Sequence, residues 1–164
     1  MKIHGSTNIM MLAGLAVSAA FVMLRSAAAQ EAREKKIKRS DLPAAVQKTV
    51  DAQSAGATIK GFSEEKENGQ TFYEAEMIVN GLAKDILMDP TGTVVEVEQQ
   101  VPFNSLPAEV KSALHAKAGK GKISKVESLT KHDKLVAYEA VVRTDGKKSE
   151  IQVSPDGRPL IHEE

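Results

Sequence analysis

The chain has 164 residues, enough for about one ordinary domain, and its 22 basic and 22 acidic side chains give a formal net charge of zero. It contains no cysteine, which excludes disulfide bonds and cysteine-ligated metal sites. The zero net charge argues against a uniformly basic nucleic-acid-binding protein, and the 41% hydrophobic content argues against wholesale disorder. We therefore expect a globular chain without a nucleic-acid partner.

The first 29 residues are predicted to be an export signal. Residues 9–24 form an uncharged, mostly apolar run, and Ala27 and Ala29 supply the small-x-small pattern of a cleavage site, with Gln30 as the first mature residue. The run is shorter than the roughly 20 residues that span a bilayer, so we expect no stable membrane anchor after cleavage. An uncleaved anchor is the alternative, because the flank after the run is more basic than the flank before it. The predicted location is the periplasm or the external medium.

Two similar units are predicted to follow a basic linker. Residues 30–40 form the linker, and the units cover residues 41–100 and 105–164. The segment Leu-Pro-Ala-Ala-Val that begins at Leu42 corresponds to Leu-Pro-Ala-Glu-Val at Leu106. The offset between matched residues changes from 64 to 65 along the units. A single residue inserted in a hairpin turn explains this change.

Each unit is predicted to contain one short helix followed by about four strands. Pro43 and Pro107 suit the first helical turn, and Gly56 and Gly119 can end the helices. Two-residue hairpin turns and type I turns punctuate the rest of each unit, at Asn68-Gly69, Asn80-Gly81, Asp89-Pro-Thr-Gly92, Asp145-Gly146 and Ser154-Pro-Asp-Gly157. The predicted fold class is α+β, with two tandem repeats of a helix and a four-stranded antiparallel sheet, the helices on one face.

Alternation along the predicted strands separates a core face from an open face. Tyr73, Ala75, Met77 and Val79 are predicted to face the core. The open face would carry the candidate partner-binding residues, which are Phe72, Glu74, Glu76, Ile78, Glu139, Val141 and Arg143. Either the sheet curls over the apolar members of this set, or they await a partner.

The order of motifs resembles the PepSY-like, beta-lactamase-inhibitor-like family. Both units carry Leu-Pro-x-x-Val at the helix start, Tyr-Glu in a strand, a glycine turn and a final Pro-x-Gly, so the resemblance covers residues 41–164. It implies a tandem helix-plus-four-strand fold in an exported bacterial protein, and a concave sheet surface that grips an enzyme in the inhibitor relative. This chain lacks disulfides and tryptophan, so inhibition of a beta-lactamase is not implied.

No motif for catalysis or for a cofactor occurs in the sequence. Nucleotide-binding loops, dinucleotide fingerprints, and metalloprotease and serine-hydrolase motifs are all missing. We therefore predict a non-enzymatic, exported binding module without a cofactor or a metal centre, which engages a protein or peptide through the open sheet face. The alternative is a periplasmic module that binds a cation or small ligand with the acidic first unit, whose net charge is −7 against +2 for the second.

Overall fold

The computed structural model describes residues 34–164 except for residues 68, 161 and 163. The predicted export signal, with Ala27, Ala29 and Gln30 at its cleavage site, lies outside the described residues. Within the described part of the chain, none of the helices has both the length and the apolar character needed to cross a membrane.

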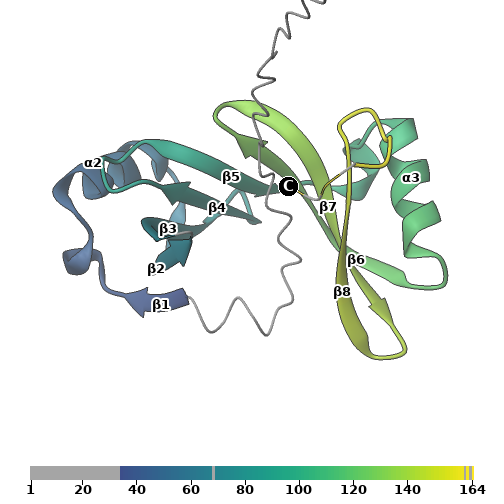
Figure 1. Cartoon of the computed structure of the whole chain (residues 1–164), viewed down its shortest axis with the longest axis horizontal. Helices are drawn as coiled ribbons and strands as arrows, with labels where there is room; N and C mark the ends of the chain where they lie inside the picture. The colour runs from purple at the N-terminus through teal and green to yellow at the C-terminus, as the bar shows by residue number, and fades with distance from the viewer. Residues whose placement is uncertain (1–33, 68, 161, 163) are drawn as a thin grey trace, which may run out of the picture.

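Strands dominate the fold (Figure 1). In chain order the elements are β1 (Glu34–Ile37), the 3-10 helix η1 (Arg39–Asp41), α2 (Ala44–Gln53), β2 (Thr58–Glu67), β3 (Gln70–Val79), β4 (Leu82–Met88), β5 (Val94–Gln100), the 3-10 helix η2 (Phe103–Ser105), α3 (Ala108–Ala118), β6 (Lys122–Lys131), β7 (Lys134–Thr144) and β8 (Lys147–Val153).

All the strands belong to one antiparallel sheet. Each strand pairs with its neighbours in sequence, from β1 to β8. The predicted fold class, two tandem repeats with a four-stranded sheet each, is therefore wrong. Strand β5 pairs with β6 from Glu96 opposite Lys131 to Gln100 opposite Glu127, and this pairing joins the two halves of the chain. It also satisfies the backbone N–H and C=O groups that a free β5 edge would leave unpaired.

The strands are divided unequally between the halves. The first half, residues 34–100, supplies β1 to β5, and the second half, residues 101–164, supplies only β6 to β8. Strand β1 arises within the predicted linker and pairs with β2. The chain after β8 contains Pro155 and Pro159, which lack the backbone N–H that a further strand would need, and the described residues there form no strand.

Each helix buries an apolar stripe against its own part of the sheet. Val46 and Val50 of α2 are completely buried, as are Val110 and Leu114 of α3. The cluster under α2 contains Leu42, Val46, Val50, Phe62, Ala75, Met77, Ile86 and Met88, with Tyr73 and Val79 packed against it. The cluster under α3 contains Leu106, Val110, Leu114, Val126, Ala140 and Val153. The predicted core face of β3 is therefore confirmed.

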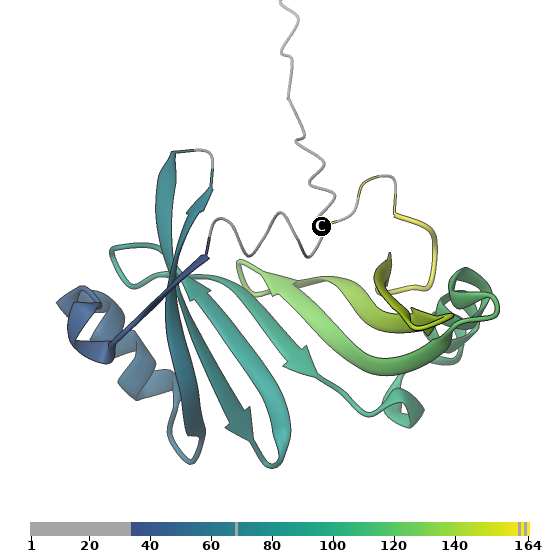
Figure 2. The ribbon, with the colours of Figure 1, turned by 90° about the horizontal axis from the view of Figure 1, so that it is seen from below.

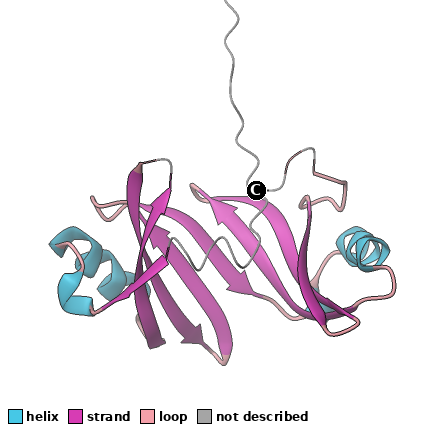
Figure 3. Cartoon of the chain, turned by 60° about the horizontal axis from the view of Figure 1, so that its bottom comes forward, coloured by secondary structure: helices cyan, strands magenta, loops and turns pink. Residues whose placement is uncertain are grey.

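Both helices lie on the same face of the sheet. Val97 packs against the cluster under α2 and lies opposite Thr130 of β6. Val126, in the cluster under α3, shares the face of Thr130 because alternate residues of a strand point to the same side. The helices stand at opposite ends of the sheet (Figures 2 and 3), so its other face is covered by no helix of the described residues.

A glycine turn fits closely against the first turn of each helix. Gly92 and Gly157 end the type I turns at residues 89–92 and 154–157 and have φ angles of +82° and +78°. A Cβ atom at Gly92 would lie 2.6 Å from the carbonyl oxygen of Ala45, and one at Gly157 would lie 2.7 Å from the backbone of α3. Only glycine fits at these two positions without displacement of the helix.

Candidate binding face

We call the side of the sheet opposite to the helices the open face. In the first half, strand register and alternation place mainly acidic side chains on it, and Lys36 is the basic residue among them. The acidic residues are Glu34, Glu65, Glu67, Glu74, Glu76, Asp85, Glu96 and Glu98. In the second half basic side chains predominate: Lys122, Lys125, Lys131, Lys134, Arg143 and Lys148 lie with Glu127, Glu139 and Glu150. The open face thus has an acidic half and a mainly basic half.

A row of carboxylates crosses the acidic half. Glu76 of β3 lies directly opposite Asp85 of β4, and Asp85 lies directly opposite Glu98 of β5. Like charges directly opposite each other on neighbouring strands destabilise a sheet. Burial raises the pKa of the Asp85 carboxyl to about 6, and the nearby charges of Glu127 and Glu76 contribute to the increase. The row therefore stores electrostatic repulsion that a cationic group would relieve.

Glu74 is a second strained carboxylate on β3. Burial raises its pKa to about 7, against an opposing hydrogen bond that the Ser63 hydroxyl donates to its Oε2 over 2.8 Å. The charge of Glu65 adds to the increase. At neutral pH the Glu74 side chain is accordingly shared between its protonated and ionised forms.

Lysines compensate part of this charge. The Lys36 ammonium lies 2.6 Å from Glu34 Oε1 and also pairs with Glu76, and hydrogen bonds to these two carboxylates raise the pKa of Lys36. At the junction of the halves, the Lys125 ammonium lies 2.6 Å from Glu127 Oε2. The bond from Lys36 to Glu76 also links β1 to β3 across β2.

A small recess opens between these carboxylates. Its volume of about 20 Å³ is sufficient for one water-sized group. The lining residues are Glu65, Glu74, Asp85, Leu87, Glu96 and Glu98. Five of the six carry carboxyl groups, so the recess favours a cationic occupant.

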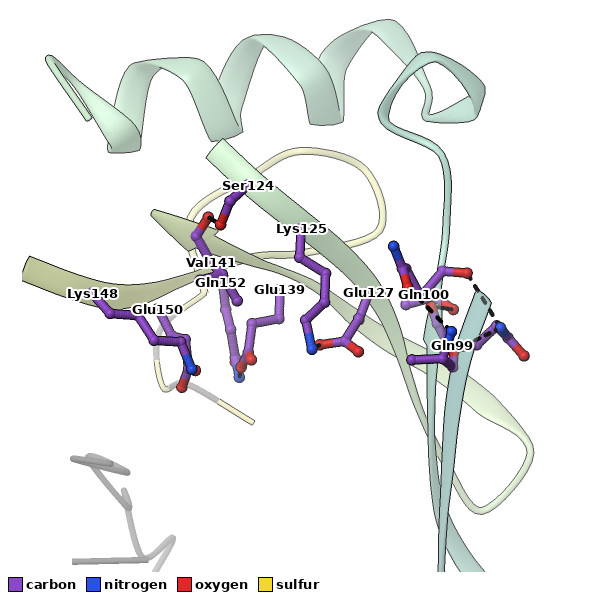
Figure 4. A network of polar contacts seen from close by, with 12 residues as sticks. Gln99, Gln100, Ser124, Lys125, Glu127, Glu139, Val141, Lys148, Glu150 and Gln152 are labelled. Atoms are coloured by element: carbon purple, nitrogen blue, oxygen red, sulfur yellow. Dashed lines mark hydrogen bonds and ion pairs between the residues drawn. The ribbon is translucent and has the colours of Figure 1, made fainter. Parts of the chain in front are cut away.

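The second half of the open face carries a hydrogen-bonded network (Figure 4). Lys125, Glu127, Glu139 and Gln152 of this network project from β6, β7 and β8 on the side away from α3. The amide of Gln152 donates to Glu139 Oε2 over 2.8 Å and to the carbonyl oxygen of Glu164 over 3.3 Å. Lys131 lies 3.6 Å from the Glu164 carboxylate. Glu164 therefore lies on this half of the open face.

Comparisons with known proteins identify the fold. No protein-family model matches the sequence, and no curated protein is similar to it. A crystal structure of a BLIP-like protein from Bacteroides fragilis has a TM-score of 0.55 and 22% identity, and the alignment covers 74% of this chain and 85% of that one. The chain has a BLIP-like fold.

Two further solved structures are similar to this chain in fold. A proposed periplasmic protein of Bacteroides eggerthii has a TM-score of 0.60 and 19% identity, over 74% of this chain and 88% of that chain. A DUF2874 family protein of Bacteroides ovatus has a TM-score of 0.57 and 20% identity, over 73% of this chain and 84% of that chain. At these identities the similarity establishes the fold alone, so any function must be argued from the site.

The structure divides the predicted partner-binding residues into two groups on the BLIP-like sheet. Phe72, Glu74, Glu76 and Ile78 lie on β3, and Glu139, Val141 and Arg143 lie on β7. Strands β4, β5 and β6 separate the two groups. Their role in binding stays a prediction.

The apolar members of this set do not form an exposed patch. Val141 is buried, and Phe72 and Ile78 are half-buried. Among the described residues, Ile59 is the only large hydrophobic side chain that is exposed. Of the two alternatives for these side chains, the structure therefore favours a sheet that covers them, and the accessible feature of the open face is its charge.

Sequence reasoning missed the carboxylates between the two groups. Asp85 of β4, Glu96 and Glu98 of β5, and Glu127 of β6 bridge the space between β3 and β7. Alternation of charged and apolar residues is present in Glu-Val-Glu at residues 96–98, whereas Asp85 is followed by three apolar residues and shows no such alternation. Only the pairing of β5 with β6 brings them to the centre of one face.

Proposed function

We propose that the protein is an exported, periplasmic, non-enzymatic binding module of the PepSY-like, beta-lactamase-inhibitor-like type, whose open face engages a protein or peptide partner. The export signal predicted in the sequence and the description of the Bacteroides eggerthii neighbour as a proposed periplasmic protein support the location. The observation that carries the function is the acidic half of the open face, which no helix of the described residues covers.

The charges on this half point to a partner with basic side chains. The repulsion along Glu76, Asp85 and Glu98 falls when a lysine or arginine approaches, and charge-assisted hydrogen bonds to carboxylates are among the stronger polar contacts. A basic partner would also draw the proton from Glu74, whose raised pKa leaves it partly protonated at neutral pH. The absence of an exposed apolar patch among the described residues makes charge, rather than apolar burial, the main source of recognition.

Charge reversal on the two sides of the sheet tests the proposal. A lysine-rich peptide of about 12 residues and a glutamate-rich peptide of equal length are titrated into the purified protein by fluorescence anisotropy. We expect binding of the lysine-rich peptide and no binding of the glutamate-rich peptide. Glu74→Lys should lower the affinity for the lysine-rich peptide at least tenfold. Glu109→Lys is the matched control, because Glu109 is exposed on α3 on the helix side of the sheet and its reversal should leave affinity unchanged.

Several outcomes would reject this face as the binding surface. Equal affinities of Glu74→Lys and Glu109→Lys would do so, and so would an association rate that does not fall as salt is raised. Glu74→Gln provides a milder change if the lysine variant fails to fold, and circular dichroism monitors folding of each variant. Reversal at Glu139, on the mainly basic half, should have a smaller effect than reversal at Glu74. Affinity capture from an envelope extract with the wild-type and Glu74→Lys proteins would then identify the natural partner.

A further inference from the structure

Three carboxylates converge where the two halves of the sheet meet. Asp85, Glu98 and Glu127 come from the adjacent strands β4, β5 and β6. Each residue contributes one oxygen to a group of three oxygens that all lie within 4.8 Å of one another. The group adjoins the small recess, which Asp85 and Glu98 also line.

The Glu127 carboxylate is buried, and one of its two oxygens has no hydrogen-bond partner among the described residues. Its side chain is only 4% exposed, and its Oε2 pairs with Lys125. Its Oε1 is buried and has no hydrogen-bond partner among the described residues. A buried acceptor without a partner is costly, and more so when it carries charge. This oxygen therefore points to a further group at the junction, in addition to Lys125.

We propose that Asp85, Glu98 and Glu127 bind a divalent cation of the size of calcium at the centre of the open face. Calcium accepts carboxylate oxygens at about 2.3–2.6 Å, so one ion can reach oxygens up to roughly 5 Å apart. Magnesium requires about 2.0–2.1 Å and nearly ideal octahedral geometry, and so spans no more than roughly 4 Å. Carboxylates from three separate strands suit the flexible coordination of calcium better than the near-ideal octahedron that magnesium requires, and the recess provides space for water to complete the coordination.

Lys125 sets the strength of this site. Its ammonium group neutralises one of the three carboxylate charges and lies next to the same carboxylate that would bind the ion. Electrostatic repulsion between the ammonium and the ion keeps the affinity moderate. Replacement of Lys125 by methionine, which keeps the apolar stem, should therefore raise the affinity for calcium severalfold.

Titration with calcium alone tests the site and does not depend on the proposed peptide partner. Calorimetry with calcium chloride and with magnesium chloride is carried out on the purified wild-type protein at low ionic strength. We expect one calcium ion per chain, weaker binding of magnesium, and at least tenfold weaker calcium binding in Asp85→Asn and Glu98→Gln. Glu64→Gln is the matched control, because Glu64 lies on the helix side of β2. The affinity of this variant for calcium should equal that of the wild type.

Thermal unfolding provides a second measurement on the same variants. Calcium should raise the melting temperature of the wild type and of Glu64→Gln, and should leave that of Asp85→Asn unchanged. Absence of calcium binding in both the wild type and Lys125→Met would overturn the proposal, as would equal affinities in Glu98→Gln and Glu64→Gln. Loss of peptide binding with calcium binding intact would reject the proposed function and leave the cation site standing.

Discussion

The two halves of the molecule support their helices in the same way. Each helix follows a 3-10 turn and a proline, and each is covered by a type I turn whose glycine touches its first turn. The matched residues are equally buried in both halves: Leu42 and Leu106, Val46 and Val110, and Val50 and Leu114. Packing between helix and sheet leaves little freedom at these positions, because interiors are close-packed.

The open faces of the two halves differ. The first half spreads acidic side chains over five strands. The second half has three strands and mainly basic side chains, and Gln152 and Lys131 bind Glu164 there. Residues on this face are not fixed by a helix above them, so their charges can diverge while the core stays alike. The helix side therefore maintains the fold, and the open face is where function is to be sought.

The largest expected effect tests whether the two cores unfold together. Leu114→Ala should lower the free energy of unfolding by about 3–4 kcal/mol, and Val50→Ala, which removes fewer buried carbons, by about 2 kcal/mol. Because one sheet joins the halves, both variants should show a single unfolding transition in urea, followed by circular dichroism. Ser112→Ala, on the exposed side of α3, is the control and should change stability by less than about 0.5 kcal/mol. Two separate transitions would show that the cores are independent.

Alanine at the turn glycines tests whether the two helix supports are equivalent. Gly92→Ala and Gly157→Ala should each cost about 3 kcal/mol, because alanine combines an unfavourable positive φ with a clash against the helix backbone. Gly146→Ala is the matched control: Gly146 has a φ of +79°, but a methyl group there would meet no atom within 4 Å, so strain alone should cost about 1 kcal/mol. Urea denaturation measures all three. Equal costs at Gly146 and Gly92 would mean that the turn does not press on α2.

The elements that local chemistry determines could be predicted from the sequence. Proline at the helix start, and Asn-Gly and Asp-Gly at the hairpins, have conformational preferences that act within a few residues, and Asn80 and Asp145 indeed have positive φ angles. Alternation in β3 identified its core face for the same reason, because burial selects every second side chain.

The pairing of β5 with β6 could not be predicted in this way. The signal for it would have to come from residues such as Glu96 and Lys131, which are opposite each other only after the halves meet. The sequence repeat suggested two equal units, but the first half has the additional strand β1. Its segment contains only one large apolar residue, Ile37, which lies opposite Phe62 of β2, so no alternation indicated a strand there. The carboxylates at the junction were missed for the same reason, since Asp85 and Glu127 lie far apart in sequence.

The acidic half should also give the protein a distinctive pH dependence. The pKa of Glu74 is raised from 4.5 to about 7 in the folded state, so folding favours its protonated form. The stability from this group is fully present below about pH 4.5 and is lost as the pH rises through 7. Glu74→Gln cannot titrate, so its stability relative to the wild type should increase by about 3 kcal/mol between about pH 4.5 and about pH 8. Urea denaturation at the two pH values measures this, and parallel pH profiles of the two proteins would contradict the prediction.

The smallest expected effect concerns a hydrogen bond between α2 and its glycine turn. The Thr49 hydroxyl of α2 donates a hydrogen bond of 2.7 Å to the carbonyl oxygen of Gly92, and at the corresponding position of α3 the chain has Ala113. Thr49→Val removes the hydroxyl but keeps the branched shape, and should cost about 1 kcal/mol. Since Gly157 approaches α3 as Gly92 approaches α2, Ala113→Thr should be more stable than Ala113→Val by a similar amount. Urea denaturation of the three variants and the wild type measures both differences. If Thr49→Val is less stable than the wild type but Ala113→Thr and Ala113→Val are equally stable, then the carbonyl oxygen of Gly157 is not within hydrogen-bond distance of residue 113, and the two turns contact their helices differently.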